Sequence, residues 1–165
     1  MIETVCGPLP PDELGFTLPH EHVFINLMPE YRGEGLLNDP DLMAHELDLF
    51  RRAGGRSLVE TTSSGLGRDA RGLHTVATRV GVNIVMGSGY YRDPYLPVDH
   101  IDRTNADGLS ELIVHDIEEG VDDSGIRAGV IGEVGCDKWY VSAREERSLR
   151  AAAKAQLRTG LAITT

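Results

Sequence analysis

Strand-like and helix-like segments alternate along the whole sequence. Apolar runs typical of strands occur at residues 14–22, 57–62, 83–87, 128–134 and 161–165. Segments with apolar residues at helical spacing lie between them, at residues 40–53, 68–80, 105–120 and 143–159. Because short strands joined by helices of this length form parallel βαβ units, we predict an α/β fold with four βα units and the start of a fifth strand. The segment MIETVCGPLPPDELGFTL, which precedes this pattern, is predicted to form a hairpin or cap.

The composition is that of one globular domain. The chain has 165 residues, of which 41% are hydrophobic and 25% charged, which suits a single folded unit. Its 16 basic and 26 acidic residues give a net charge of −10, which disfavours nucleic acid and anionic membranes as partners. No apolar run approaches the ~18 residues of a membrane span, and no signal peptide pattern opens the sequence. Cys6 and Cys136 lack metal-site spacing and suit reduced thiols, so we expect a cytoplasmic protein.

A His-x-His motif ends the first long strand, in the sequence Leu18-Pro19-His20-Glu21-His22. Residues two apart in a strand point to the same face, so His20 and His22 can converge on one metal ion. The carboxyl ends of parallel strands are also where α/β folds collect their functional groups. The alternative is a pair of strand-end histidines that are hydrogen-bonded to neighbours, and the spacing alone leaves both interpretations open.

Glu133 is the second candidate ligand, within the apolar run Val130–Val134. A carboxylate in a buried strand is costly unless it is paired or binds a metal. A salt bridge to a neighbouring arginine is the alternative explanation. Histidine nitrogen and carboxylate oxygen together favour a divalent ion such as Zn²⁺.

Several other motifs are given structural rather than functional interpretations. The run Gly65-Leu66-Gly67-Arg68-Asp69-Ala70 fits a loose dinucleotide fingerprint, but the next strand does not end in the acidic residue that would hold a ribose. Four histidines are expected to be surface or interface residues, three in helices and one in a loop: His45, His74, His115 and His100. Cys136 is expected to be a small buried thiol rather than a nucleophile.

Five segments in order carry a family resemblance: GFTLPHEHVFIN, GLGRDARGL, VNIVMGSGYYRDPYLP, GVDDSGIRAGVIGEVG and LRAAAKAQLRTGLAITT. They resemble the phosphotriesterase family, a branch of the amidohydrolase superfamily whose members are metal-dependent hydrolases on a (β/α)8 (TIM) barrel. The resemblance runs from Ile2 to Thr165. It implies that residues 1–165 are the amino-terminal half of one such domain, with an N-terminal β-hairpin, four βα units and the beginning of the fifth strand. A complete barrel needs about 250 residues.

The resemblance also implies roles for individual residues. His20 and His22 match ligands of the more buried ion of a pair of divalent ions, for which zinc is expected. Glu133 stands where the best-known members have a carboxylated lysine, and it resembles a branch in which a glutamate bridges the two ions directly. The second ion's two histidines and the proton-shuttling aspartate belong to later strands, beyond this sequence. Tyr91 matches an aromatic pocket loop and is the candidate substrate contact, and residues 28–38 are the other expected rim element.

The implied activity is hydrolysis of a lactone, carboxylic ester or phosphoester by a metal-bridged hydroxide. The expected partner is a small-molecule substrate, with a homodimer as the candidate assembly of the full-length protein. The 165 residues alone are expected to show at most trace hydrolysis. The alternative is a non-catalytic half-barrel that binds a metal or a partner chain.

Overall fold

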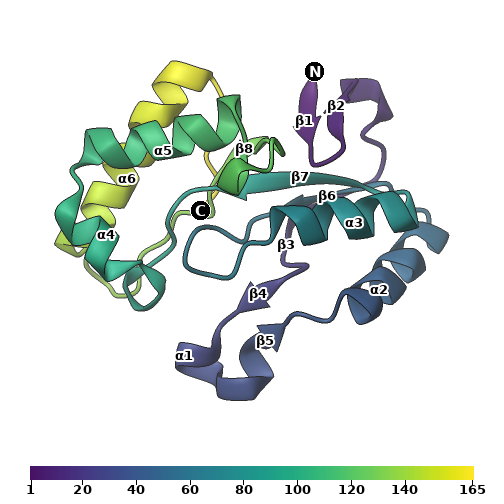
Figure 1. Cartoon of the computed structure of the whole chain (residues 1–165), viewed down its shortest axis with the longest axis horizontal. Helices are drawn as coiled ribbons and strands as arrows, with labels where there is room; N and C mark the ends of the chain where they lie inside the picture. Colours follow the sequence, from purple (N-terminus) through teal and green to yellow (C-terminus); the bar gives the residue numbers. More distant parts are fainter.

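Four parallel strands and the helices that follow them form a curled half-barrel (Figure 1). The computed structural model describes residues 1–165. The strands are hydrogen-bonded in sequence order: β3 (Thr17–Glu21), β6 (Ser57–Glu60), β7 (Asn83–Ser88) and β8 (Val130–Ile131). The main helices are α2 (Pro40–Arg52), α3 (Ala70–Val80), α5 (Ala106–Glu118) and α6 (Ala143–Thr159). This arrangement is half of a (β/α)8 barrel and confirms the predicted fold class.

Two apolar clusters hold the helices against the sheet. The first joins α2 and α3 to the strands, with Leu58, Leu73 and Ile84 at its centre. The second joins α5 and α6 to β8, where Ala151 and Ala155 face Leu109 and Ile113 on α5. Small alanine side chains let two helices approach closely, so α6 packs along α5 rather than standing apart from it.

Local signals in the sequence set the helix ends. Asp39, Asp69, Asn105 and Ser142 occupy the N-cap positions, and each side chain accepts hydrogen bonds from backbone N–H groups of the first turn. Helix α3 stops at Gly81 and α6 at Gly160, both in the left-handed conformation that glycine adopts readily. The helix predicted to begin at residue 68 therefore begins at Ala70, after its Asp69 cap. No helix combines the length and apolar character needed to cross a bilayer.

The predicted N-terminal hairpin is confirmed. Strands β1 (Ile2–Thr4) and β2 (Gly7–Leu9) pair antiparallel, followed by a single turn of 3-10 helix, η1 (Pro11–Glu13). The Val5 N–H donates to the Ile84 carbonyl over 2.8 Å. Arg127 holds Glu3 by an ion pair of 3.0 Å. The hairpin therefore lies beside β7, ahead of the point where β8 begins to pair.

The connections contain short elements that the sequence pattern did not reveal. The segment predicted as a rim loop, residues 28–38, contains α1 (Met28–Tyr31), η2 (Arg32–Gly35) and β5 (Leu36–Leu37), and β5 pairs with β4 (Ile25–Asn26). Three further short helices follow: η3 (Asp93–Tyr95), α4 (Val98–Arg103) and η4 (Val121–Asp123). His100 lies in α4 and not in a loop, so that prediction is wrong. These elements are one turn or two long, too short for periodicity to indicate them.

Four of the predicted strands are shorter than expected, and the one predicted at 57–62 ends at Glu60. The strand predicted at 14–22 starts at Thr17, and the strand predicted at 128–134 keeps only Val130–Ile131 because the chain then turns across the sheet. The predicted fifth strand is a single parallel bridge between Ile131 and Ile163. Two backbone hydrogen bonds flank it, from Ile131 N–H to Ala162 and from Thr164 N–H to Ile131.

The outer edge of β3 leads to a prediction about association. β3 pairs only with β6, and a groove of about 270 Å³ beside it is lined by Leu18, Met43 and Phe50. Unpaired strand edges next to apolar surface favour association. We expect the 165-residue chain to self-associate in light scattering, and a Thr17→Lys variant, which adds charge to this edge, to associate less. A monodisperse monomer at high concentration would contradict the prediction.

Candidate metal centre

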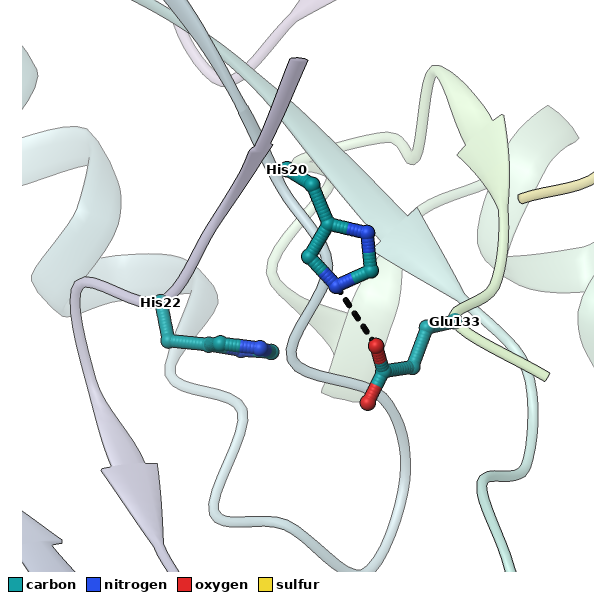
Figure 2. A group of neighbouring side chains, drawn as sticks. All are labelled: His20, His22 and Glu133. Atoms are coloured by element: carbon teal, nitrogen blue, oxygen red, sulfur yellow. Dashed lines mark ion pairs between the residues drawn. The ribbon is translucent and has the colours of Figure 1, made fainter. Parts of the chain in front are cut away.

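Two histidines meet where β3 ends. His20 lies in β3, and His22 follows its last residue. Their rings lie 5.5 Å apart between centroids, edge to face at 74°. Figure 2 shows both rings directed toward the same space, in front of Glu133. The spacing of two residues therefore brings both rings together, as the strand geometry predicts.

Glu133 reaches the histidines from the other side of β7. After β8 the chain turns across the end of β7: the Gly132 N–H donates to Ser88 (2.7 Å), and the Glu133 N–H donates to Thr61 (2.9 Å). A Cβ atom on Gly87 would lie 2.2 Å from the Gly132 carbonyl oxygen. Glycine at position 87 is therefore what lets the chain cross β7 closely and bring Glu133 over the sheet.

The three side chains form one compact group of donor atoms. His20 Nε2 lies 2.6 Å from Glu133 Oε2, drawn as the dashed line in Figure 2. One ligand atom from each of His20, His22 and Glu133 lies within 4.8 Å of the others. Two imidazole nitrogens and a carboxylate oxygen are normal zinc ligands. The residues present therefore fit a divalent ion.

Burial shifts the pKa values of two of these three residues. Burial, with help from neighbouring His20, lowers the pKa of His22 to about 4. His22 is therefore neutral at pH 7, which is the form that binds a metal. Burial raises the pKa of Glu133, against the opposing effect of His20. Glu133 is only 7% exposed, and the ion pair that it forms is with His20 rather than with an arginine.

Tyr91 lies beside the segment that carries Glu133. A Cβ atom on Gly135 would lie 2.5 Å from the Tyr91 ring, so the ring packs directly on that glycine. Tyr91 stacks on Tyr95 at 6.0 Å, and the Arg92 guanidinium lies 5.2 Å from the centre of each ring. Tyr91 is thus held by Tyr95 and Arg92 against the segment that follows Glu133.

The residues around Tyr91 tie three connections together. Arg92 forms ion pairs with Glu30 in α1 and with Asp137 after β8. The Tyr95 hydroxyl donates to Glu30 over 2.6 Å. The segment predicted as a rim element, residues 28–38, therefore contacts the Tyr91 loop.

Sequence reasoning missed two residues next to His22. Glu60, in β6, has no exposed surface, and the Thr62 hydroxyl lies 2.5 Å from Glu60 Oε1 and 3.0 Å from His22 Nδ1. Burial raises the pKa of Glu60 to about 7. A glutamate in the apolar run SLVETT carries the same signal that identified Glu133, since a buried carboxylate needs a partner.

Comparison with known proteins identifies the family of this chain. The model of the phosphotriesterase family matches residues 1–165. The chain belongs to the phosphotriesterase family. The resemblance carried by the five sequence segments is confirmed.

Family relatives match this chain over about half of their own length. An N-acetyltaurine hydrolase from Dictyostelium discoideum is 32% identical, over 99% of this chain and 57% of the relative. A resiniferatoxin-binding protein from Rhodobacter sphaeroides has 37% identity and a TM-score of 0.88, over 97% of this chain and 53% of that one. A lactonase from Listeria monocytogenes has 26% identity and a TM-score of 0.88, over 98% and 55% of the two chains.

The remaining motifs of this phosphotriesterase-family chain lie apart from the metal centre. His45, His74 and His115 are exposed on α2, α3 and α5, as expected. Helix α3 begins at the end of the glycine-rich run of residues 65–70. The Asp69 carboxylate caps this helix and accepts a hydrogen bond from the Gly72 N–H over 2.8 Å. A phosphate bound at that helix end would be repelled by this carboxylate.

Cys136 corrects the expectation of a buried thiol. Both cysteines are free and exposed. Cys136 is exposed because the chain after Glu133 leaves the sheet and runs over the surface. Partial desolvation and the carboxylates of Glu145 and Asp93 raise the pKa of the Cys136 thiol. A raised thiol pKa lowers the thiolate fraction, so the residue is a poor nucleophile.

Proposed function

We propose that this chain supplies the first metal site of a metal-dependent hydrolase of the phosphotriesterase family. The observation that carries the proposal is the grouping of His20, His22 and Glu133 within 4.8 Å, on two strand ends of a half-barrel. Residues 1–165 would form the amino-terminal half of a single hydrolase domain. Zinc is the ion that the nitrogen and oxygen donors favour.

Each residue would have a distinct task at this site. His22, neutral because of its burial, would donate a ring nitrogen without first losing a proton. Glu133 has two oxygens, so it could bind one ion beside His20 and offer the other oxygen to a second ion. Two divalent ions bound there would lower the pKa of a coordinated water and polarise the oxygen of the bond under attack.

The proposed substrates contain a carbonyl or phosphoryl group that water can attack: a lactone, a carboxylic ester or a phosphoester. The similarity of this chain to the lactonase from Listeria monocytogenes favours a lactone among these three substrate classes. An N-acyl amide is a second candidate, since curated relatives from Dictyostelium and from Xenopus tropicalis are named N-acetyltaurine hydrolases. A non-catalytic half-barrel that binds a metal or a partner chain is the competing proposal. Cytoplasmic location and a homodimer of the full-length protein stay predictions.

A substrate screen separates these proposals. The protein encoded by the complete reading frame, loaded with zinc, should hydrolyse at least one class among lactones, aryl esters, phosphotriesters and N-acyl amines. The His22→Ala variant of the same protein should not. A full-length protein that binds zinc but hydrolyses none of these classes favours the non-catalytic half-barrel.

Tyr91 is proposed to line the substrate pocket, because its ring packs on Gly135, two residues after Glu133. Replacing Tyr91 with alanine removes an aromatic contact surface, so KM should rise about tenfold or more, as expected for loss of ~1.4 kcal/mol of binding. Tyr91→Phe keeps the ring and should retain a KM close to wild type unless the hydroxyl binds substrate. Steady-state kinetics on the substrate found in the screen measure both. An unchanged KM in Tyr91→Ala would exclude Tyr91 from the pocket.

A further inference from the structure

A buried chain of hydrogen bonds leads from the interior of the sheet to His22. Glu60 Oε1 lies 2.5 Å from the Thr62 hydroxyl, and that hydroxyl lies 3.0 Å from His22 Nδ1. Glu60 also accepts from the backbone N–H groups of Val23 (3.2 Å) and Thr62 (3.1 Å). Both Glu60 and Thr62 have no exposed surface.

We propose that Glu60 and Thr62 are positioning residues that hold His22 with its proton on Nδ1 and its Nε2 free to bind a divalent metal. The proposal rests on the proposed function, since it concerns how one ligand of that site is oriented. Thr62 reaches the group formed by His20, His22 and Glu133 through its hydrogen bond to the His22 ring.

The order of donors along the chain fixes the tautomer of His22. An ionised Glu60 has no proton to give, so the Thr62 hydroxyl must donate its single hydrogen to Glu60 Oε1. The Thr62 oxygen then has only lone pairs to offer, and His22 Nδ1 must be the donor to it. In a neutral imidazole that leaves Nε2 as the unprotonated nitrogen.

The location of the chain explains why a buried acid is tolerated here. Glu60 is held by two backbone N–H groups and one hydroxyl, which offset part of the cost of its burial. The Val23 N–H belongs to the residue directly after His22, so Glu60 restrains both the ring and the backbone of this ligand. Metal-binding histidines elsewhere commonly have their second nitrogen fixed in this way, and loss of that partner lowers metal affinity 10–100-fold.

The deciding variant is Thr62→Val, which removes the bridging hydroxyl and keeps the side-chain shape. Glu60 retains its bonds to the Val23 and Thr62 amides in this variant. Thr62→Ser restores a hydroxyl and is the rescue. Thr61→Val is the matched control, because Thr61 is also fully buried, its hydroxyl approaches only the Glu21 carbonyl, at 3.4 Å, and the substitution keeps the backbone carbonyl that accepts from Glu133. Glu60→Gln is a further variant, but it places an amide against backbone donors and can destabilise the fold.

Three measurements on the full-length protein test the proposal at pH 8.5, above the Glu60 pKa of about 7. Chelator competition should show zinc affinity reduced about 10–100-fold in Thr62→Val, and near wild type in Thr62→Ser and Thr61→Val. The visible spectrum of the cobalt-loaded protein should change in Thr62→Val alone. Nitrogen NMR of labelled, metal-free protein should show His22 protonated on Nδ1 in wild type and a mixture of tautomers in Thr62→Val.

The results distinguish failure of this proposal from failure of the proposed function. If wild-type protein binds zinc and Thr62→Val binds it equally well, the positioning role is wrong. An equal loss of affinity in Thr61→Val would also overturn it, since the effect would then be one of general packing. If wild type binds no zinc, the proposed function fails, and the NMR tautomer alone decides whether Thr62 orients His22.

Discussion

Replacing Glu133 with glutamine should lower the zinc affinity of the protein by at least ~100-fold, more than the 10–100-fold expected for loss of a residue that only orients a ligand. The substitution keeps the shape of the side chain and removes its negative charge. Glu133 is 7% exposed and lies 2.6 Å from His20 Nε2. In so little water, the attraction between carboxylate and cation is poorly screened. His22→Ala should have a comparable effect because it removes a neutral nitrogen ligand.

Glu21→Gln provides the matched control for Glu133→Gln. Glu21 lies between the two histidines in sequence and lines the groove beside Leu18 and Met43, which His22 also lines, but it is not one of the three residues whose donor atoms converge. The Glu21→Gln variant removes the same negative charge, but Glu21 does not belong to the group formed by His20, His22 and Glu133. Isothermal titration and metal analysis after dialysis measure the affinity and the number of ions bound. Wild-type affinity in Glu133→Gln would remove Glu133 from the metal site.

The second large effect is expected for stability, at Glu145. This side chain is 1% exposed and accepts from the backbone N–H groups of Asp93 (3.2 Å), Asp137 (2.6 Å) and Ser142 (2.9 Å). Glu145→Ala leaves these donors without their partner, at a cost of ~1–3 kcal/mol for each one that stays buried. We expect the free energy of unfolding to fall by about 3–5 kcal/mol, measured by urea denaturation.

The neighbouring residue supplies the control for Glu145. Glu146 is exposed and pairs with Arg150 one helical turn away, so Glu146→Ala should change the free energy of unfolding by no more than ~0.5 kcal/mol. The prediction for Glu145 is wrong if the free energies of unfolding of Glu145→Ala and Glu146→Ala differ by less than ~1 kcal/mol.

The pKa of Glu145 gives this contribution a pH dependence. Burial alone would raise the pKa, but hydrogen bonds from the Ser142, Asp137 and Asp93 backbone outweigh it and hold the pKa below the usual 4.5. A carboxyl with a lowered folded-state pKa stabilises the fold above its unfolded pKa, and this stabilisation is lost as pH falls through the folded pKa. The difference between wild type and Glu145→Ala should therefore be full above about pH 5 and shrink below pH 4.5. A difference that stays constant down to pH 2.5 would contradict this.

Sequence patterns predicted the repeating architecture because each element carries its own local signal. Strand and helix periods, helix caps and glycine stops act over two to four residues, so they can be recognised along the chain. The same locality explains the errors. Residues 132–134 have the apolar character of a strand, but contacts of Gly132 with Ser88 and of Glu133 with Thr61 pull them across the sheet. Those contacts join residues far apart in sequence.

The candidate metal centre was predictable in its parts. His20 and His22 share a face because a strand repeats every two residues, and Glu133 stood out because a buried carboxylate needs a partner. Glu60 carries the same signal, but no pattern in the sequence links it to its partners Val23 and Thr62. The exposure of Cys136 was equally hidden, since it depends on the path that the chain takes after crossing β7.

The amino-acid sequence by itself determined the order of βα units, the family and the three residues that can bind a metal. Only the tertiary structure decided that their donor atoms meet within 4.8 Å and that Glu60 and Thr62 contact His22 from behind. The physical reason is the range of the interactions. Periodicity and capping act between neighbours in the chain, whereas Glu133 lies more than 100 residues beyond His20, and only the curl of the sheet and the close crossing at Gly87 bring them together.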